Sequence, residues 1–344
     1  MCKTVARRMA AVIVLVVLTQ LVGDAAPPYA GTIFLDRNIL TASDPTAFVS
    51  AAYTGTGRRQ VFDRRVNAWV TIGNAFLVNA AFVDTDRLIE VIVNPEFGTQ
   101  EAALAEAQKY ARLVGQLPAV LRAKVQSITI HQGTQPFGGG NNNILIHTGQ
   151  SAQYEAQGII EETLVHEAAH TSLDGDHANA AGWVAAQRAD PDFISTYARD
   201  NPTREDVAET FLLQLAFRHR RDRITAALSS TIERTVPNRI VYLDQQNFDL
   251  FPFVTLPASI AAVSENADID AGSTTTLQVV AGGSVPLSYQ WYLGASGDTA
   301  SPIDGATGSS FTTPQLSSSA QFWVKVSNPY GPAAHSRAIS VRVR

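Results

Sequence analysis

Hydrophobic and polar positions divide the chain into a mixed region and a strand-rich region. Up to about residue 253, runs of β-branched and aromatic residues predict strands, and stretches of helical period predict helices. The expected strands are Thr32–Leu35, Val61–Val70, Leu88–Val93, Val125–His131 and Ile144–His147, and the expected helices are Thr99–Val114, Ile159–Thr171 and Pro202–Arg218. Because the pattern passes from strands to helices, we expect an α+β domain here.

The pattern changes after about Leu256. Charged residues become rare, and short alternating strands are separated by Ser, Thr and Gly. Strands of this length at regular spacing are typical of an all-β sandwich. Three segments are more specific, namely Leu277–Val279, Tyr289–Tyr292 and Phe322–Asn328. They resemble an immunoglobulin-like domain of the kind appended to exported bacterial proteins.

This resemblance implies particular core positions. Trp291 would be the core tryptophan of the third strand. Val279 and Val324 would stand at the two positions of the inter-sheet disulfide, and Phe322 at the position of the corner tyrosine. Two valines fill a similar volume without a covalent link, so the fold is expected and the disulfide is not.

The first residues follow the pattern of a secretory signal peptide. Lys3, Arg7 and Arg8 precede the apolar run Met9–Leu18, and small residues follow it. We expect cleavage after Ala25 or Ala26, and so a signal peptide over 1–26. The alternative is a membrane anchor, but the apolar run is short for a span of about 20 residues. The prediction is a secreted or periplasmic protein with no membrane attachment after cleavage.

Composition narrows the remaining choices. The 344 residues are 45% hydrophobic and 17% charged, which excludes wholesale disorder. The net charge is −5 and no Lys/Arg block follows the N-terminus, so we expect no nucleic-acid partner. The only cysteine is Cys2, which leaves neither a disulfide framework nor a cysteine-based metal site.

Asp63-Arg64-Arg65 is interpreted as a surface ion pair rather than as a group that lines a cleft.

The motif that carries chemistry is His166-Glu167-Ala168-Ala169-His170. Histidines at i and i+4 of a helix lie on one face, so both imidazoles can bind the same Zn²⁺. The glutamate then lies beside the zinc-bound water and accepts its proton as the water attacks a carbonyl group. We therefore predict one Zn²⁺ per chain, with His166 and His170 as ligands and Glu167 as the general base.

A third ligand is required, and one source lies just after the motif. Asp174, Asp176 and His177 are the nearby candidates. Asp176 is at the spacing of the metzincin third ligand, but Leu173 stands where that pattern has glycine. A metzincin also needs a methionine turn, and both methionines of this chain lie in the expected signal peptide. The metzincin interpretation is therefore rejected.

The second source is the helix predicted after Asn201, which is a plausible N-cap residue with Pro202 behind it. Glu205 and Glu209 lie four residues apart and share a face. Here the sequence resembles the gluzincin metallopeptidases, and its Glu-Asp-x-Ala-Glu-x-Phe run resembles the ligand helix of the lethal-factor type of catalytic domain. The resemblance implies that Glu205 is the third ligand and that Glu209 orients His166 or His170. Spacing alone leaves these two roles exchangeable, and a glutamate pair near a helix start can also simply complement the helix dipole.

The same resemblance implies two further parts of the site. Tyr197 lies just before the ligand helix, where lethal-factor-like sites have a tyrosine that stabilises the oxyanion; a packing role is the alternative. A strand before the motif helix pairs with extended peptide in zincins. We expect that strand to be Asn143, Ile144, Leu145, Ile146 and His147, after the flexible triple glycine Gly138-Gly139-Gly140.

The sequence thus predicts an α+β zincin-like catalytic domain (27–253) followed by an all-β immunoglobulin-like sandwich (254–344). The expected function is hydrolysis of peptide bonds in a protein or peptide substrate by a secreted zinc metallopeptidase. Two alternatives remain open. One is an extracellular binding or adhesion protein whose immunoglobulin-like domain holds a surface or matrix ligand. The other is a zinc hydrolase of non-peptide substrates.

Overall fold

The computed structural model describes residues 26–32 and 39–344. The expected signal peptide lies outside the described residues except for Ala26, and so does the expected strand Thr32–Leu35 except for Thr32. Within the described part of the chain, none of the helices combines the length and apolar character needed to span a bilayer.

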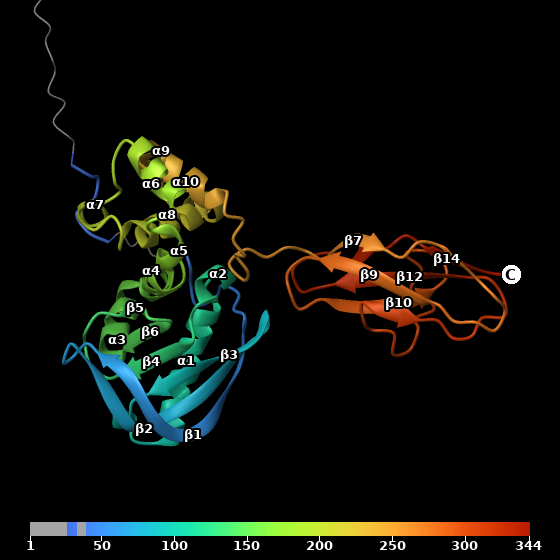
Figure 1. The fold of residues 1–344 in the computed structure, drawn as a ribbon, viewed down its shortest axis with the longest axis horizontal. Coiled ribbons are helices and arrows are strands. Elements are labelled where there is room, and N and C mark those ends of the chain that lie inside the picture. Colours follow the sequence, from blue (N-terminus) through green and yellow to red (C-terminus); the bar gives the residue numbers. More distant parts are fainter. Residues whose placement is uncertain (1–25, 33–38) are drawn as a thin grey trace, which may run out of the picture.

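A six-stranded mixed sheet organises the N-terminal part of the fold (Figure 1). Its order is β1-β2-β3-β4-β6-β5, with β3, β4 and β6 parallel and the other pairs antiparallel. The strands are β1 (Phe48–Asp63), β2 (Ala68–Phe82), β3 (Thr85–Val93), β4 (Ser127–His131), β5 (Gly138–Gly140) and β6 (Asn143–His147). Strand β5 therefore forms one edge of this sheet.

The expected strand Val61–Val70 is wrong, because a turn divides it. β1 and β2 form a long hairpin whose ladder closes at the pair Asp63 and Ala68. The Asp63 carboxylate accepts a hydrogen bond from the backbone N–H of Arg65 at 2.9 Å, and Asn67 has φ of 51°. Asparagine tolerates this left-handed conformation, so polar residues make a turn between two apolar runs.

The expected flexible loop after Gly138 is a second, tight hairpin. Gly138–Gly140 pairs antiparallel with β6, and Asn141 and Asn142 connect the two strands with φ of 50° and 56°. Two successive residues of positive φ make the two-residue turn whose twist matches that of the flanking strands. The triple glycine is thus an ordered edge strand.

Helices pack on one face of this sheet and extend beyond it (Figure 1). The Thr99 hydroxyl caps the first long helix by accepting from the backbone N–H of Ala102. Alternate residues of β4 and β6, among them Ile128 and Ile144, are fully buried against the helices. The helices are α1 (Gln100–Gly115), α2 (Ala119–Arg122), α3 (Thr148–Gln157), α4 (Ile160–Ser172), α5 (Asp174–His177), α6 (Ala181–Ala189), α7 (Thr196–Asp200), α8 (Asp206–His219), α9 (Ala226–Thr235) and α10 (Pro237–Asp244), with short 3₁₀ turns at η1 (Pro95–Phe97) and η2 (Arg221–Arg223).

The ligand helix α8 begins later than expected. The backbone N–H groups of Arg204 and Glu205 donate to the carbonyl of Asn201, so residues 201–205 form a turn and Asn201 is not the N-cap. Glu205 occupies the N-cap position, immediately before the first helical residue, Asp206. The candidate ligand thus lies at the N-terminal end of α8, just before its first turn.

Two further sheets form a sandwich in the C-terminal part of the chain. One has the order β10-β12-β14-β8, with β13 beside β12, and the other has the order β11-β9-β7. Trp291 is fully buried between them together with Val279 and Val324, which come from opposite sheets. The strands are β7 (Ser259–Val263), β8 (Ala267–Ile269), β9 (Thr276–Gly282), β10 (Ser288–Leu293), β11 (Ser310–Thr312), β12 (Ala320–Ser327), β13 (Ala334–His335) and β14 (Ile339–Val343).

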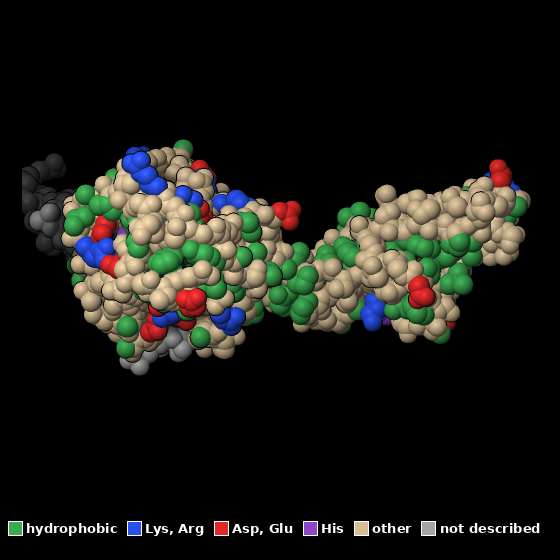
Figure 2. All heavy atoms as spheres, turned by 90° about the horizontal axis from the view of Figure 1, so that it is seen from below, with side chains coloured by type: hydrophobic (Ala, Val, Ile, Leu, Met, Phe, Trp, Pro, Cys, Tyr) green, Lys and Arg blue, Asp and Glu red, His purple; other side chains and the backbone are tan. Residues whose placement is uncertain are grey.

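The two parts have separate hydrophobic cores. The chain leaves α10 and enters the sandwich through a connecting segment, where the rings of Phe251 and Tyr330 meet at 6.0 Å. The Asn328 side chain donates to the carbonyl oxygen of Leu256 at 2.8 Å, which ties this segment to the sandwich. On the face shown in Figure 2, acidic and basic side chains are interspersed over the N-terminal part, and charges are sparse over the sandwich.

Candidate metal centre

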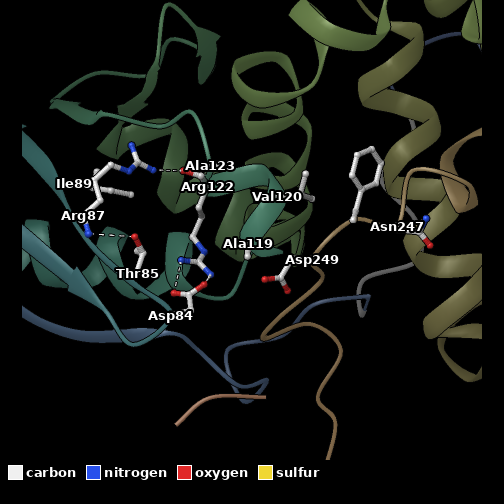
Figure 3. Close-up of a pocket in the computed structure, with 11 residues that line it drawn as sticks. Asp84, Thr85, Arg87, Ile89, Ala119, Val120, Arg122, Ala123, Asn247 and Asp249 are labelled. Atoms are coloured by element: carbon white, nitrogen blue, oxygen red, sulfur yellow. Dashed lines mark hydrogen bonds and ion pairs between the residues drawn. The ribbon is translucent and has the colours of Figure 1, made fainter. Parts of the chain in front are cut away.

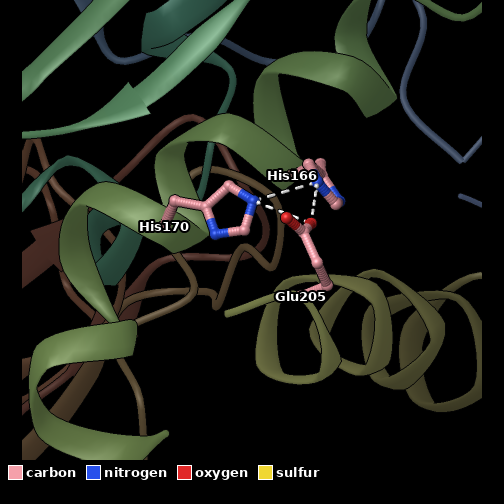
Figure 4. A group of neighbouring side chains, drawn as sticks. All are labelled: His166, His170 and Glu205. Atoms are coloured by element: carbon pink, nitrogen blue, oxygen red, sulfur yellow. Dashed lines mark hydrogen bonds and ion pairs between the residues drawn. The ribbon is translucent and has the colours of Figure 1, made fainter. Parts of the chain in front are cut away.

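His166, His170 and Glu205 meet between α4 and α8 (Figure 4). The two histidines lie one turn apart on α4, and Glu205 reaches them from the start of α8. The Nε2 atoms of His166 and His170 are 3.0 Å apart, and Glu205 Oε2 lies 3.4 Å from the first and 3.3 Å from the second. Three potential ligand atoms from two helices therefore converge on one point.

The spacing of these atoms matches the requirements of zinc. Imidazole and carboxylate ligands bind Zn²⁺ at about 2.0–2.1 Å in a tetrahedron, which separates neighbouring ligand atoms by about 3.4 Å. The three separations observed here fall at or slightly below that value. The donor set also suits zinc, since two imidazoles and one carboxylate leave a fourth position open. The residues present therefore fit the ion.

Asp174 holds His170 from the opposite side of its ring. Its Oδ2 atom lies 2.8 Å from His170 Nδ1, so the nitrogen that faces away from the cluster is bonded to a carboxylate. Burial lowers the pKa of His170, but the hydrogen bonds to Asp174 and Glu205 outweigh it and raise the pKa to about 10. The surroundings of this imidazole thus strongly favour positive charge.

Glu205 is nearly buried and is held by three partners. Burial raises its pKa, but contacts with His166 and His170 outweigh burial and hold the pKa below its ordinary value. Tyr197, on α7, donates its hydroxyl to Glu205 Oε1 at 2.8 Å. Tyr197 is 40% exposed, so its hydroxyl reaches the cluster from the solvent side. The structure therefore places Tyr197 at the site, in contact with the third candidate ligand.

Glu209 does not make the contact expected of it. Its Oε2 atom accepts a hydrogen bond from Ser195 Oγ at 2.5 Å, and the same hydroxyl accepts from the backbone N–H of Ala198 to cap α7. The buried Nδ1 atom of His166 has no hydrogen-bond partner in the described part of the chain. Glu209 lies one turn into α8, and its bond to Ser195 ties α8 to the start of α7, the helix that carries Tyr197. The carboxylate that orients a histidine is instead Asp174.

Glu167 lies beside the cluster, next to the edge strand. Its carboxylate contributes to raising the pKa of His170, and it forms no hydrogen bond within the described residues. The backbone at Glu167 packs closely against β5, since a Cβ atom on Gly139 would lie only 1.8 Å from the Glu167 carbonyl oxygen. Only glycine allows this approach. The edge strand is thereby fixed against the motif helix at the position of the candidate base.

The expected substrate strand is corrected. Asn143–His147 forms β6, which is parallel to β4 along its whole length and antiparallel to β5 at Asn143, Ile144 and Leu145. Both edges of these three residues are occupied, so they have no free edge for a peptide. His147 is fully buried and stacks on His131 with ring centroids 5.6 Å apart. Strand β5, which the sequence pattern suggested to be a loop, takes the edge position.

The other residues weighed as ligands lie elsewhere. Asp176 pairs with Lys124 at 2.6 Å, and His177 meets the Tyr242 hydroxyl at 2.8 Å. Sequence reasoning missed the role of Asp174 on His170, although an acid four residues after a helical histidine is a signal for it. It also missed Tyr154, whose pKa is raised by burial and by the charge of Glu167.

A cleft of about 450 Å³ between β3 and α2 lies apart from the cluster (Figure 3). Arg122 pairs there with Asp84 at 2.5 Å, and Arg87 donates to the backbone carbonyl groups of Arg122 and Val125. The described residues of its lining include no histidine, cysteine or serine. Both arginines are thus already bonded within the protein, and the Asp249 carboxylate accepts a hydrogen bond from the backbone N–H of Phe251.

Comparisons with known proteins concern only the C-terminal part. Residues 257–344 match the family model described as an Ig-like domain, CHU_C associated. No curated protein matches the chain at a significant level. The DIP-gamma IG1+IG2 structure is 20% identical over 26% of this chain and 50% of that one, with a TM-score of 0.22. The tandem Ig repeats of Dlar are 14% identical over 26% and 48%, with a TM-score of 0.23. The chain thus covers about half the length of these structures.

The family match agrees with the sandwich described above, in which Trp291 is buried between two sheets. The chain therefore combines a mixed α/β N-terminal part, which carries the candidate metal centre, with a C-terminal immunoglobulin-like domain.

Proposed function

We propose that the N-terminal part, residues 27–253, is a zincin-like domain that hydrolyses peptide bonds with the help of one zinc ion held by His166, His170 and Glu205. The observation that carries the proposal is the convergence of these three ligand atoms within 4.8 Å of one another. The hydrogen bond that the outer nitrogen of His170 donates to Asp174 supports it, because ligating histidines are typically oriented in this way.

A zinc ion held there supplies Lewis acidity, which lowers the pKa of water and polarises a carbonyl group. Glu167 accepts the proton of the attacking water and passes it to the leaving amine. Glu167 lies beside the cluster, and its carboxylate forms no hydrogen bond with another described residue. Both features suit this role. The Tyr197 hydroxyl already contacts the cluster through its hydrogen bond to Glu205. From there it can turn toward the oxyanion.

The peptide lies along β5 in this proposal. An extended segment can add to a sheet edge through main-chain hydrogen bonds, and β5 is an edge strand that packs on α4 at Glu167. This arrangement brings a scissile bond past the general base. We further propose that the chain is exported, as the N-terminal pattern predicts, so that its substrates are proteins or peptides outside the cytoplasm.

Glu167→Gln tests the mechanism. The amide cannot accept a proton but is nearly isosteric, so we expect zinc content to be unchanged and hydrolysis of a casein substrate to fall by at least about 100-fold. Zinc is measured by atomic emission and hydrolysis by release of labelled peptides. Wild-type activity should also vanish with a chelator and return with zinc. A Glu167→Gln protein that retains both zinc and activity would refute the proposed role.

The same assay separates the alternatives. Activity on esters or amides but on no protein favours a zinc hydrolase of other substrates. A zinc-free protein that hydrolyses nothing favours a binding protein, with which the immunoglobulin-like domain is compatible.

A further inference from the structure

A cavity of about 300 Å³ lies beside the edge strand β5. It is bounded by the turn of the β1–β2 hairpin on one side and by Gly138–Gly140 on the other. Among the described residues that line it, Arg64 is the only charged one and none is acidic. The cavity therefore presents a positive charge to whatever occupies it.

The Arg64 guanidinium lies directly over β5. A Cβ atom on Gly138 would lie 2.8 Å from Arg64 Nη2 and 3.5 Å from its Cζ, so the missing side chain leaves the space that the guanidinium uses. Arg64 forms no ion pair or hydrogen bond with another described residue. Its neighbour Arg65 differs, because it pairs with Asp63 at 2.8 Å and with Glu96 at 2.7 Å.

This corrects the interpretation of Asp63-Arg64-Arg65 as a simple ion pair. Asp63 and Arg65 do pair, on one side of the hairpin. Arg64, the first residue of the turn after β1, lines the cavity instead. A half-buried guanidinium without a partner is costly unless a ligand or solvent completes its hydrogen bonds.

The cavity and the proposed general base lie on opposite faces of β5. Gly139 packs on the backbone of Glu167 on the face that the helices cover, whereas Gly138 and its partner Leu145 line the cavity on the other face. The pKa of Tyr154 is raised by burial, and it also responds to the negative charge of Glu167 and to the positive charge of Arg64. Both charges therefore act on one phenol. A peptide that runs along β5 past Glu167 places a side chain within reach of Arg64.

Aromatic residues form the outer wall. Trp69 is 53% exposed and meets Phe62 edge to face at 5.8 Å, and both line the cavity. A large exposed indole is unusual unless it contacts a partner. Such a wall suits the methylene groups of a side chain whose polar end lies deeper.

We propose that this cavity is a specificity subsite for an acidic side chain of the peptide substrate, with Arg64 pairing with its carboxylate. The inference rests on the proposed peptidase function and names its substrate class. Phe62 and Trp69 contact the stem of the side chain. Glutamate fits better than aspartate, because its longer stem spans the aromatic wall before the carboxylate reaches the guanidinium.

Paired peptides test the proposal. Each position around the scissile bond of a cleaved peptide is set in turn to Glu, Gln or Lys, and kcat/KM is measured by competition with mass spectrometry. We expect the full-length zinc-loaded protein to prefer Glu over Gln by about tenfold or more at one position, the effect of one charge-assisted pair. Arg64→Gln should reduce this ratio to about one, and Arg64→Glu should reverse the preference toward Lys.

Two further variants keep the result interpretable. Arg188→Gln removes the same charge from an exposed site on α6 and should leave the Glu/Gln ratio as it is. Arg64→Lys keeps the charge and should retain a preference for Glu. Circular dichroism and zinc content establish that each variant is folded.

The outcomes separate the two claims. Cleavage of Glu and Gln peptides at equal rates at every position, or a ratio that survives Arg64→Gln, would overturn the subsite and leave the peptidase intact. Failure of the wild-type protein to cleave any peptide would overturn the proposed function, and this subsite with it.

Discussion

At the scale of single residues, His170 is distinctive because carboxylates contact both sides of its ring. Glu205 faces Nε2 at 3.3 Å and Asp174 faces Nδ1 at 2.8 Å. The outer bond fixes the ring orientation and increases the basicity of the nitrogen that points into the cluster. His166 has no such support, since its Nδ1 atom has no partner among the described residues. We therefore expect His170 to be the better-ordered ligand and Asp174 to govern metal affinity.

Asp174→Asn should weaken zinc binding by about 10- to 100-fold, the usual cost of losing an orienting carboxylate. Asp176→Asn is the matched control. Asp176 lies on the same short helix, but its exposed carboxylate pairs with Lys124, so the zinc affinity of this variant should stay at the wild-type value. Affinity is measured by competition with a chromophoric chelator. Equal affinity of Asp174→Asn and wild type would contradict the role given to Asp174.

At the scale of elements, the site depends on the close packing of β5 against α4. The Gly140 N–H donates to Thr171 Oγ1 at 2.8 Å, and the same hydroxyl donates to the carbonyl of Asn143. Gly139 meets the backbone of Glu167 without a side chain between them. One turn of α4 is thus bonded to the β5–β6 hairpin, which holds the edge strand at a fixed height beside Glu167.

Gly139→Ala should destabilise this packing. Its Cβ atom would lie 1.8 Å from a backbone oxygen that cannot rotate away, so β5 or α4 must shift, at a cost of about 1–3 kcal/mol. Gly73→Ala in β2 is the control, because no atom lies within 4 Å of its added Cβ atom. The midpoint of urea unfolding measures both. Identical midpoints for the two variants would show that the close approach of Gly139 to Glu167 does not affect the free energy of unfolding.

The motif helix and its two histidines were predictable because their spacing is a property of a single helix. The edge strand was not, because three glycines carry no hydrophobic pattern, and their strand form depends on pairing with β6 and packing on α4. Spacing could not separate Glu205 from Glu209 either. The turn at 201–205 places Glu205 at the cluster, and besides its own backbone bonds that turn depends on Gln187, whose side chain donates to the carbonyl of Pro202 at 3.1 Å.

At the scale of the whole molecule, the two parts of the chain have different architectures, each with its own hydrophobic core. The N-terminal core joins a mixed sheet to helices, and the C-terminal core joins two sheets around Trp291. Val285 and Tyr330 of the sandwich pack against the N-terminal core, with the Tyr330 ring centroid 6.0 Å from that of Phe251. Separate cores joined by limited contact generally unfold as separate units.

Trp291→Ala tests that separation. Loss of a fully buried tryptophan costs about 3–5 kcal/mol, which should lower the thermal transition of the sandwich and leave zinc content as in wild type. Differential scanning calorimetry should show two transitions in the wild-type protein, of which one moves. A single transition that shifts as a whole would show that the two parts are coupled.

The most direct test of the metal centre is the zinc content of the purified full chain, measured for wild type, Glu205→Ala and Glu209→Ala. Glu205 Oε2 lies at the cluster, whereas Glu209 is bonded to Ser195 and secures α7. The account predicts about one zinc per chain in wild type and in Glu209→Ala, and a loss of the ion in Glu205→Ala. Wild-type protein that neither contains zinc nor takes it up, or a Glu205→Ala protein that holds it as tightly as wild type, would contradict it.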